Sequence, residues 1–172
     1  MPEHVTTSFL QYKINISCRI HFFIMLLLDI RTLLFMAAVS AGCMGVAIGM
    51  AARVYMNSIP GMRRWAWACG GHSLAWALLY LQGTLPAFFT IVLANTVALA
   101  SVALQYRTLA EFTNRRAHRW PLVLLVLSVA CAFLYFTYVH PYTIARHVVI
   151  ASSTAVLLLL SARTLLHAAV PG

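Results

Sequence analysis

The chain has 172 residues, of which 62% are hydrophobic and only 9% are charged, and its mean hydropathy is +0.86. Soluble domains carry about a quarter charged residues, so this composition excludes a water-exposed globular surface and indicates lipid as the solvent. The net charge of +9 does not indicate a nucleic-acid partner, because the twelve Lys and Arg lie in short connections between apolar runs. We therefore expect an all-α membrane protein whose main partner is the lipid bilayer.

Residues 1–24 form a comparatively polar N-terminal extension that includes Lys13 and Arg19. The apolar run at 22–28 is too short to cross a membrane, and no small-residue cleavage site follows it, so a cleaved signal peptide is not expected. We hypothesise that translation starts at Met25, which a native peptide containing Gln11 would refute.

Residues 25–167 contain five runs near the length of about 20 apolar residues that a transmembrane helix needs. The spans are expected at about 32–52, 65–82, 87–106, 121–139 and 147–166. A tail follows at 168–172, where a longer reading frame could be truncated. The short connection at 83–86, with its Gly and Pro, predicts an antiparallel hairpin of the second and third spans. Long runs without alternation argue against a transmembrane β-barrel.

The distribution of arginine predicts the orientation of the bundle. Eight arginines follow the first, third and fifth spans, whereas four cations lie on the opposite side, and positive residues favour the cytoplasm. The N-terminus is therefore expected outside and the C-terminus in the cytoplasm. Tryptophans beside these arginines fit an aromatic belt at the inner interface. The eight are Arg53, Arg63, Arg64, Arg107, Arg115, Arg116, Arg119 and Arg163.

Neither a metal nor a cofactor is expected from the cysteines and methionines. Three cysteines lie in apolar runs and one in the N-terminal extension, without a Cys-x-x-Cys pair or a histidine at metal-ligand spacing. They are interpreted as small apolar side chains. Methionines gather around the first span; adaptable packing is favoured over a copper-binding array. These residues are Cys18, Cys43, Cys69 and Cys131, and Met36, Met44, Met50 and Met56.

The first span carries a ladder of small residues, Gly42, Gly45 and Gly49, with Ala38 and Ala41 extending it. Such ladders let helix backbones approach closely, which drives helix association in lipid. Packing within the bundle is the favoured interpretation, and a homodimer interface is the alternative.

Two polar side chains are expected inside the membrane, His72 in the second span and Asn95 near the middle of the third. Intramembrane polar groups usually face the bundle interior and find a partner. For Asn95 a structural hydrogen bond between helices is favoured over a ligand role. For His72 a structural role and protonation sensing are both left open.

The stretch YFTYVHPYTIARHVVIASS, residues 135–153, gathers polar residues between the fourth and fifth spans. Arg146, flanked by His140 and His147, lies near the start of the fifth span, where a cation and a helix N-terminus would together favour a small anionic ligand from outside. The alternative is that Arg146 reaches lipid phosphates. Three tyrosines fit headgroup depth: Tyr135, Tyr138 and Tyr142.

Four segments in this order resemble the multi-span N-terminal region of bacterial membrane-bound diguanylate cyclases, the GGDEF-domain proteins. They are LLDIRTLLF, IPGMRRWAWACGGHSLAWALL, LPAFFTIVLANTVALASVALQYRTLAEF and the 135–153 stretch, and together they extend over about residues 26–167. The resemblance implies a sensor or anchor region in a bacterial inner membrane, crossed several times, with a role in signal transduction.

In such proteins a cytoplasmic domain condenses two GTP molecules into cyclic di-GMP. This chain has no GGDEF or GGEEF loop, and its only acidic residues are Glu3, Asp29 and Glu111. Phosphoryl transfer needs carboxylate-bound metal ions, so the chain is expected to be non-catalytic and to be a fragment or truncated form. The alternatives are a small permease-like transporter and a partner-binding membrane subunit. The transporter is disfavoured because the sequence shows no convincing internal repeat and no acidic residue in any expected span.

Overall fold

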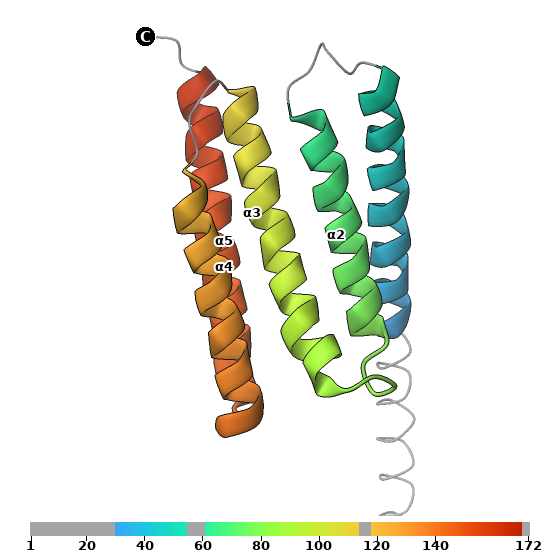
Figure 1. Ribbon diagram of the computed structural model, residues 1–172, viewed down its shortest axis with the longest axis vertical. Coiled ribbons are helices and arrows are strands. Elements are labelled where there is room, and N and C mark those ends of the chain that lie inside the picture. Colours follow the sequence, from blue (N-terminus) through green and yellow to red (C-terminus); the bar gives the residue numbers. More distant parts are fainter. Residues whose placement is uncertain (1–29, 55–60, 114–117, 170–172) are drawn as a thin grey trace, which may run out of the picture. The chain divides into compact units, whose positions relative to one another are not determined.

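The computed structural model describes residues 30–54, 61–113 and 118–169, and these residues are almost entirely helical. In chain order they form the Ile30–Val54 helix, α2 (Met62–Tyr80), η1 (Phe88–Leu93), α3 (Ala94–Phe112), α4 (Arg119–Leu134), η2 (Tyr135–Val139) and α5 (Thr143–Ala169), where η1 and η2 are π-helical (Figure 1). The described residues contain no β-strand. The expected all-α fold class is confirmed for them. The extension at 1–24, Met25, Met56, Arg115 and Arg116 lie outside the described residues.

The chain divides into two compact units, residues 1–34 and residues 35–172. Of the first unit the structure describes residues 30–34, which are helical. The second unit contains the rest of the Ile30–Val54 helix and α2 to α5. The packing described below lies within this second unit.

Four helices are long and apolar enough to cross a membrane: Ile30–Val54, Phe88–Phe112, Arg119–Val139 and Thr143–Leu166. They correspond to four of the five expected spans and differ from them by a few residues at the ends. α2, at the position of the remaining expected span, has the length but not the composition. Its first turn carries Arg63 and Arg64, and its middle carries His72 and Ser73. Four helices therefore have the length and composition to cross a membrane, and five passes remain a prediction.

Two glycines with positive φ lie on either side of α2. Gly61 precedes the helix with φ 88°, a left-handed conformation that favours glycine, and its carbonyl accepts a hydrogen bond from Trp65 N at 3.0 Å. Gly83, with φ 97°, lies in the turn after α2, where Thr84 N donates to Leu81 O at 3.1 Å. This turn reverses the chain between α2 and α3, as the sequence predicts.

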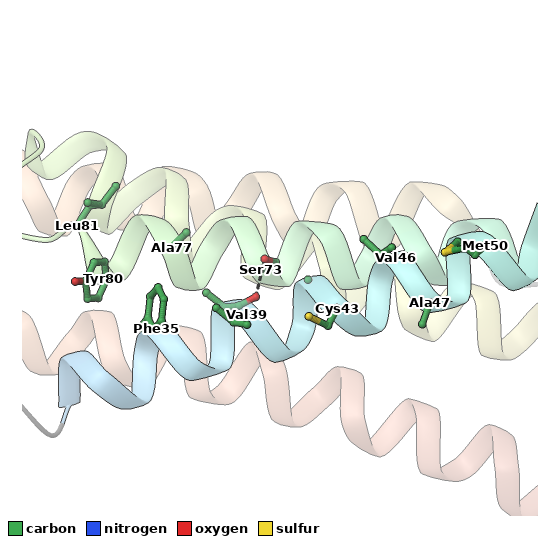
Figure 2. A pocket seen from close by; sticks show the side chains of 12 residues that line it. Phe35, Val39, Cys43, Val46, Ala47, Met50, Ser73, Ala77, Tyr80 and Leu81 are labelled. Carbon is green, nitrogen blue, oxygen red and sulfur yellow. Dashed lines mark hydrogen bonds between the residues drawn. The ribbon is translucent and has the colours of Figure 1, made fainter.

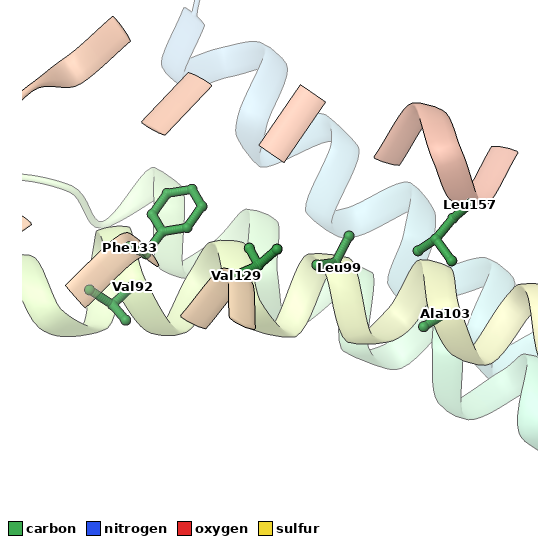
Figure 3. Packing of buried hydrophobic residues seen from close by; sticks show 6 residues of the cluster. All are labelled: Val92, Leu99, Ala103, Val129, Phe133 and Leu157. Atoms are coloured by element: carbon green, nitrogen blue, oxygen red, sulfur yellow. The ribbon is translucent and has the colours of Figure 1, made fainter. Parts of the chain in front are cut away.

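The apolar core of the second unit lies between α3, α4 and α5. Val92, Leu99 and Ala103 on the η1–α3 helix pack with Val129 and Phe133 of α4 and Leu157 of α5, and each is at most 6% exposed (Figure 3). These are packed side chains from three neighbouring helices, of which α4 runs antiparallel to α3 and α5. The core therefore holds α5 against the helices that precede it.

Five polar side chains of the η1–α3 helix bond to backbone carbonyl groups one turn earlier in the chain. Thr90, Asn95, Thr96, Ser101 and Thr108 each donate to the carbonyl oxygen four residues earlier, at 2.6–3.5 Å. In hydrocarbon an unpaired hydroxyl is costly, and this back-bonding supplies an acceptor without a second helix. The helix can thus be both polar in places and membrane-spanning.

Candidate functional site

The α4–α5 turn, residues 140–142, joins the end of η2 to the first residue of α5. His140 N donates to Tyr135 O at 3.0 Å, which closes the last π turn. Within the described residues the hydrogen-bond partner of Arg146 is Thr143, whose Oγ1 accepts from Nη2 at 3.0 Å. Arg146 is half-buried, and His140 and His147 are exposed. The structure thus brings Arg146 onto the first turn of α5, and it shows no contact that joins the two histidines to it.

Aromatic side chains surround this turn. Tyr135, Tyr138 and Tyr142 are 50%, 60% and 50% exposed, and the rings of Tyr135 and Phe136 meet edge to face with their centroids 5.3 Å apart. Tyrosine rings with one polar tip are typical of the membrane–water interface. Their exposure fits the headgroup depth that the sequence suggests.

The η2 segment contains one polar atom without a partner. Thr137 Oγ1 is buried, and it has no hydrogen-bond partner among the described residues. A buried unpaired hydroxyl costs about 1–3 kcal/mol, and π-helical turns inside α-helices frequently occur at functional sites. Together with Arg146, this makes the region around the α4–α5 turn the best candidate for recognition of a polar ligand.

The glycine seam, defined as Gly42, Gly45 and Gly49, faces α2 of the same chain. A Cβ atom added at Gly45 would lie 3.2 Å from Cys69 Cβ and 3.3 Å from Gly70 N, and one added at Gly42 would lie 3.0 Å from Ser73 Oγ. Distances this short leave little room for any side chain. The seam therefore serves packing inside the bundle, the interpretation that the sequence favours over a dimer interface.

A direct hydrogen bond crosses the same contact. Ser73 Oγ of α2 donates to the backbone carbonyl of Ala38 at 2.7 Å (Figure 2). Because hydrocarbon offers no competing partner, such a bond would help to hold these two helices together in a membrane. The sequence analysis did not single out Ser73, although its position one residue after His72 in a polar part of α2 was a usable signal.

An open apolar groove of about 740 Å³ lies beside the seam, between the part of the Ile30–Val54 helix that starts at Phe35 and α2 (Figure 2). Phe35 and Tyr80 stand at one end with ring centroids 5.8 Å apart, and Cys43, Val46 and Met50 follow along the helix. Its lining is almost wholly carbon, which suits acyl chains or another apolar helix and offers no catalytic group.

The two intramembrane polar residues that the sequence singles out lie on different helices and bond to their own backbones. His72 Nδ1 is 3.3 Å from Ala68 O, and Asn95 Nδ2 donates to Ile91 O at 2.6 Å. Asn95 was expected to bond between helices, whereas its hydrogen bond in the structure is intrahelical. The structure does not join the two residues into one site.

A charge cluster that the sequence analysis did not anticipate lies at the start of α2 and the end of α3, away from the turn that joins the two helices. The carboxylate of Glu111 forms an ion pair with Arg64 of α2 and lies 3.5 Å from Arg107 Nε, one turn earlier on α3. Glu111 is the only acidic residue among the described residues. It therefore joins the start of α2 to the end of α3 at the arginine-rich end of the helices, where Arg53, Arg63, Arg64, Arg107, Arg119 and Arg163 are found.

Among the described residues, Cys43, Cys69 and Cys131 are free thiols, and no three side chains of His, Cys, Asp or Glu gather as a metal site would require. Met44 and Met50 are 57% and 65% exposed on the Ile30–Val54 helix. Their exposure fits a surface that faces apolar surroundings. Comparisons with known proteins found no matching family, no matching curated protein and no matching solved structure.

Proposed function

We propose that the chain is a non-catalytic membrane module that senses a signal at the α4–α5 turn and transmits it through α5 to a cytoplasmic partner or domain. It would act like the membrane region of the diguanylate cyclases that its sequence resembles. In this proposal the N-terminus lies outside, the C-terminus lies in the cytoplasm, and a small anionic ligand or lipid headgroup contacts Arg146.

The observation that carries this proposal is the continuity of α5. It runs without a break from Thr143 to Ala169, 27 residues, which corresponds to about 40 Å of helix axis. Arg146 lies in its first turn, and Arg163 lies near its other end at the arginine-rich end of the helices. If such a helix moves as one rigid body, a displacement of its first turn also displaces its other end, on the opposite side of a bilayer.

The packing around α5 supports a two-position mechanism. Ser153, Leu157 and Thr164 are buried, and the two polar ones donate to carbonyl groups of α5 itself, Val149 and Leu160. Among the described residues, the hydrogen bonds of the α5 side chains all stay within α5, so none between α5 and another described helix has to break when α5 shifts. A ligand would drive such a shift only by binding the two packings with different affinity.

The test is a chimera in which the full chain is joined after Gly172 to the catalytic domain of a membrane-bound diguanylate cyclase. It is produced in bacteria that lack other cyclases, and cyclic di-GMP is measured per chimera found in the membrane. Arg146→Ala should change this level about five-fold or more, the lower range of allosteric coupling. Ser152→Ala is the control, because Ser152 is exposed on α5 and bonds only to its own helix at Val149 O.

Equal cyclic di-GMP for the unaltered, Arg146→Ala and Ser152→Ala chimeras would leave the chain as an anchor and refute the sensing role. Accumulation of a small solute by cells that make the unfused chain, abolished by Arg146→Ala, would instead support the permease alternative.

A further inference from the structure

A second groove, between α3 and α4, combines an apolar floor with two cations. It has a volume of about 270 Å³ and is lined by Ala100 and Leu104 of α3, by Val123 and Leu127 of α4, and by Arg107 and Arg119. Val123 and Leu127 are 45% and 56% exposed. The groove is therefore open to the surroundings of the helices, and its lining also includes Ala103 of the packed core.

The cations and the apolar residues are separated along the groove. α3 and α4 run antiparallel (Figure 1), so Arg107 near the end of α3 and Arg119 at the start of α4 lie at the same end. From there the apolar lining extends over seven or eight residues on each helix, which is about 10–12 Å of helix axis. One end suits a charged group and the rest suits a hydrocarbon chain.

The charge at that end is not balanced by the residues that the structure describes. Arg107 shares the carboxylate of Glu111 with Arg64, and Arg119 has no carboxylate partner among the described residues. Arg64, Arg107 and Arg119 thus carry three positive charges and Glu111 one negative charge, an excess of two positive charges among these four described residues. The guanidinium of Arg119 instead lies 5.5 Å from the ring of Trp120, which is 65% exposed. An exposed tryptophan next to an arginine at a helix start is typical of headgroup depth.

We propose that this α3–α4 groove binds one anionic phospholipid, with its phosphate between Arg107 and Arg119 and an acyl chain along Ala100, Leu104, Val123 and Leu127. Guanidinium groups bind phosphate through paired, charge-assisted hydrogen bonds, and basic pockets between transmembrane helices bind anionic headgroups. A zwitterionic lipid would bring its own cation next to Arg119, which has no carboxylate partner among the described residues, and next to Arg107, which shares one with Arg64, and this disfavours it. The bound lipid would hold the start of α4 against the end of α3. This inference does not depend on the proposed sensing function.

The test uses the full-length protein, reconstituted in bilayers with equal amounts of phosphatidylglycerol and phosphatidylcholine and then released for native mass spectrometry. The wild-type chain should retain one phosphatidylglycerol with a preference of about 30-fold, the effect expected of two arginines at a headgroup. Arg107→Gln/Arg119→Gln should abolish the preference. Arg163→Gln, which removes a charge at the same end but outside the groove, should keep it.

A second pair of variants tests the apolar part without a change of charge. Ala100→Phe fills the groove and should remove the retained lipid, whereas Ala155→Phe, at an exposed position of α5, should not. Circular dichroism checks that both variants keep the helical content of the wild type. Retention of lipid by Ala100→Phe at the wild-type level would overturn the proposal.

Other occupants of the groove give distinct results. Equal retention of the two lipids by the wild type would overturn the proposal, and so would displacement of phosphatidylglycerol by millimolar inorganic phosphate, which indicates a site for a free anion. A lipid-free dimer that Ala100→Phe converts to a monomer would assign the groove to a second copy of this chain and would also overturn it.

Discussion

The contact between Gly71 of α2 and Ser101 of α3 predicts that a substitution at Gly71 destabilises the fold and that a second substitution at Ser101 restores its stability. A Cβ atom added at Gly71 would overlap Ser101 Oγ, whereas Ser101 Cβ would stay at an ordinary 3.5 Å. Gly71→Ala therefore forces the hydroxyl out of its 2.8 Å hydrogen bond with Val97 O or moves the helices apart. Overpacking of this kind costs about 1–3 kcal/mol. The higher helix propensity of alanine offsets about 1 kcal/mol of this cost.

Ser101→Ala removes the overlapping atom and should restore the stability of the Gly71→Ala variant. By itself Ser101→Ala should cost little, because its hydroxyl bonds to its own helix and polar contacts inside membranes average about 0.6 kcal/mol. In the double variant the added methyl group gains an ordinary contact and keeps the gain in helix propensity. The coupling energy between the two substitutions is expected to be about 1–3 kcal/mol.

The assay is reversible unfolding of the full-length protein in mixed micelles, titrated with dodecyl sulfate and followed by circular dichroism. Gly70→Ala is the matched control, because a Cβ atom at Gly70 meets nothing within 4 Å and only the propensity gain of about 1 kcal/mol remains. The reasoning is wrong if Gly71→Ala and the double variant are equally destabilised, or if Gly70→Ala loses as much stability as Gly71→Ala.

Three further outcomes follow from the same packing and charges. Gly45→Val should destabilise the fold by about 1–3 kcal/mol in the same assay, because an added Cβ lies 3.3 Å from a backbone nitrogen of α2. Gly49→Ala should not, because its nearest contact is at 3.8 Å. Equal losses of stability would contradict the close packing of the glycine seam against α2. Glu111→Gln should lower stability by about 1 kcal/mol or less, since the pair is partly exposed, and the loss should shrink in 1 M salt; melting in non-ionic detergent at low and high salt measures it, and a salt-independent loss argues against an ion pair. Alkaline phosphatase inserted at Gly83 should be active outside the cell and inactive when fused after Gly172, in accordance with the arginine distribution; the reverse activities would overturn the orientation.

The helices and the turn between α2 and α3 could be predicted because both depend on local signals. Long apolar runs place a helix to within a few residues at each end, and Gly83 with Pro86 marks the reversal. The glycine seam was visible for a similar reason, since its spacing puts all three glycines on one helix face. That this face meets α2 of the same chain depends on tertiary packing, which spacing alone does not reveal.

The partners of the polar residues could not be predicted in the same way. The depth of Asn95 follows from its place in the third span, but its partner depends on how the helix is rotated, and the structure turns its amide to Ile91 of its own helix. The pair Arg64 and Glu111 lies 47 residues apart in sequence. It exists because the antiparallel α2–α3 hairpin brings the start of one helix to the end of the other. The orientation argument counts Arg64 only as a marker of topology and does not use Glu111.

α2 is the least apolar of these helices, and its surroundings explain how it can be so. Its 19 residues correspond to about 28 Å of helix axis, close to the thickness of the hydrocarbon. Ser73 bonds to Ala38 and His72 lies against Ala68 O, so neither polar group in its middle is left without a partner. On one side Gly45 approaches it, and on the other side Gly71 meets Ser101. Small side chains at these contacts let neighbouring helices cover two faces of α2. A helix that is covered in this way exposes less surface to lipid and needs fewer apolar side chains. Low hydropathy in α2 is therefore compatible with a fifth pass through the membrane, and such a pass would depend on the helices on either side.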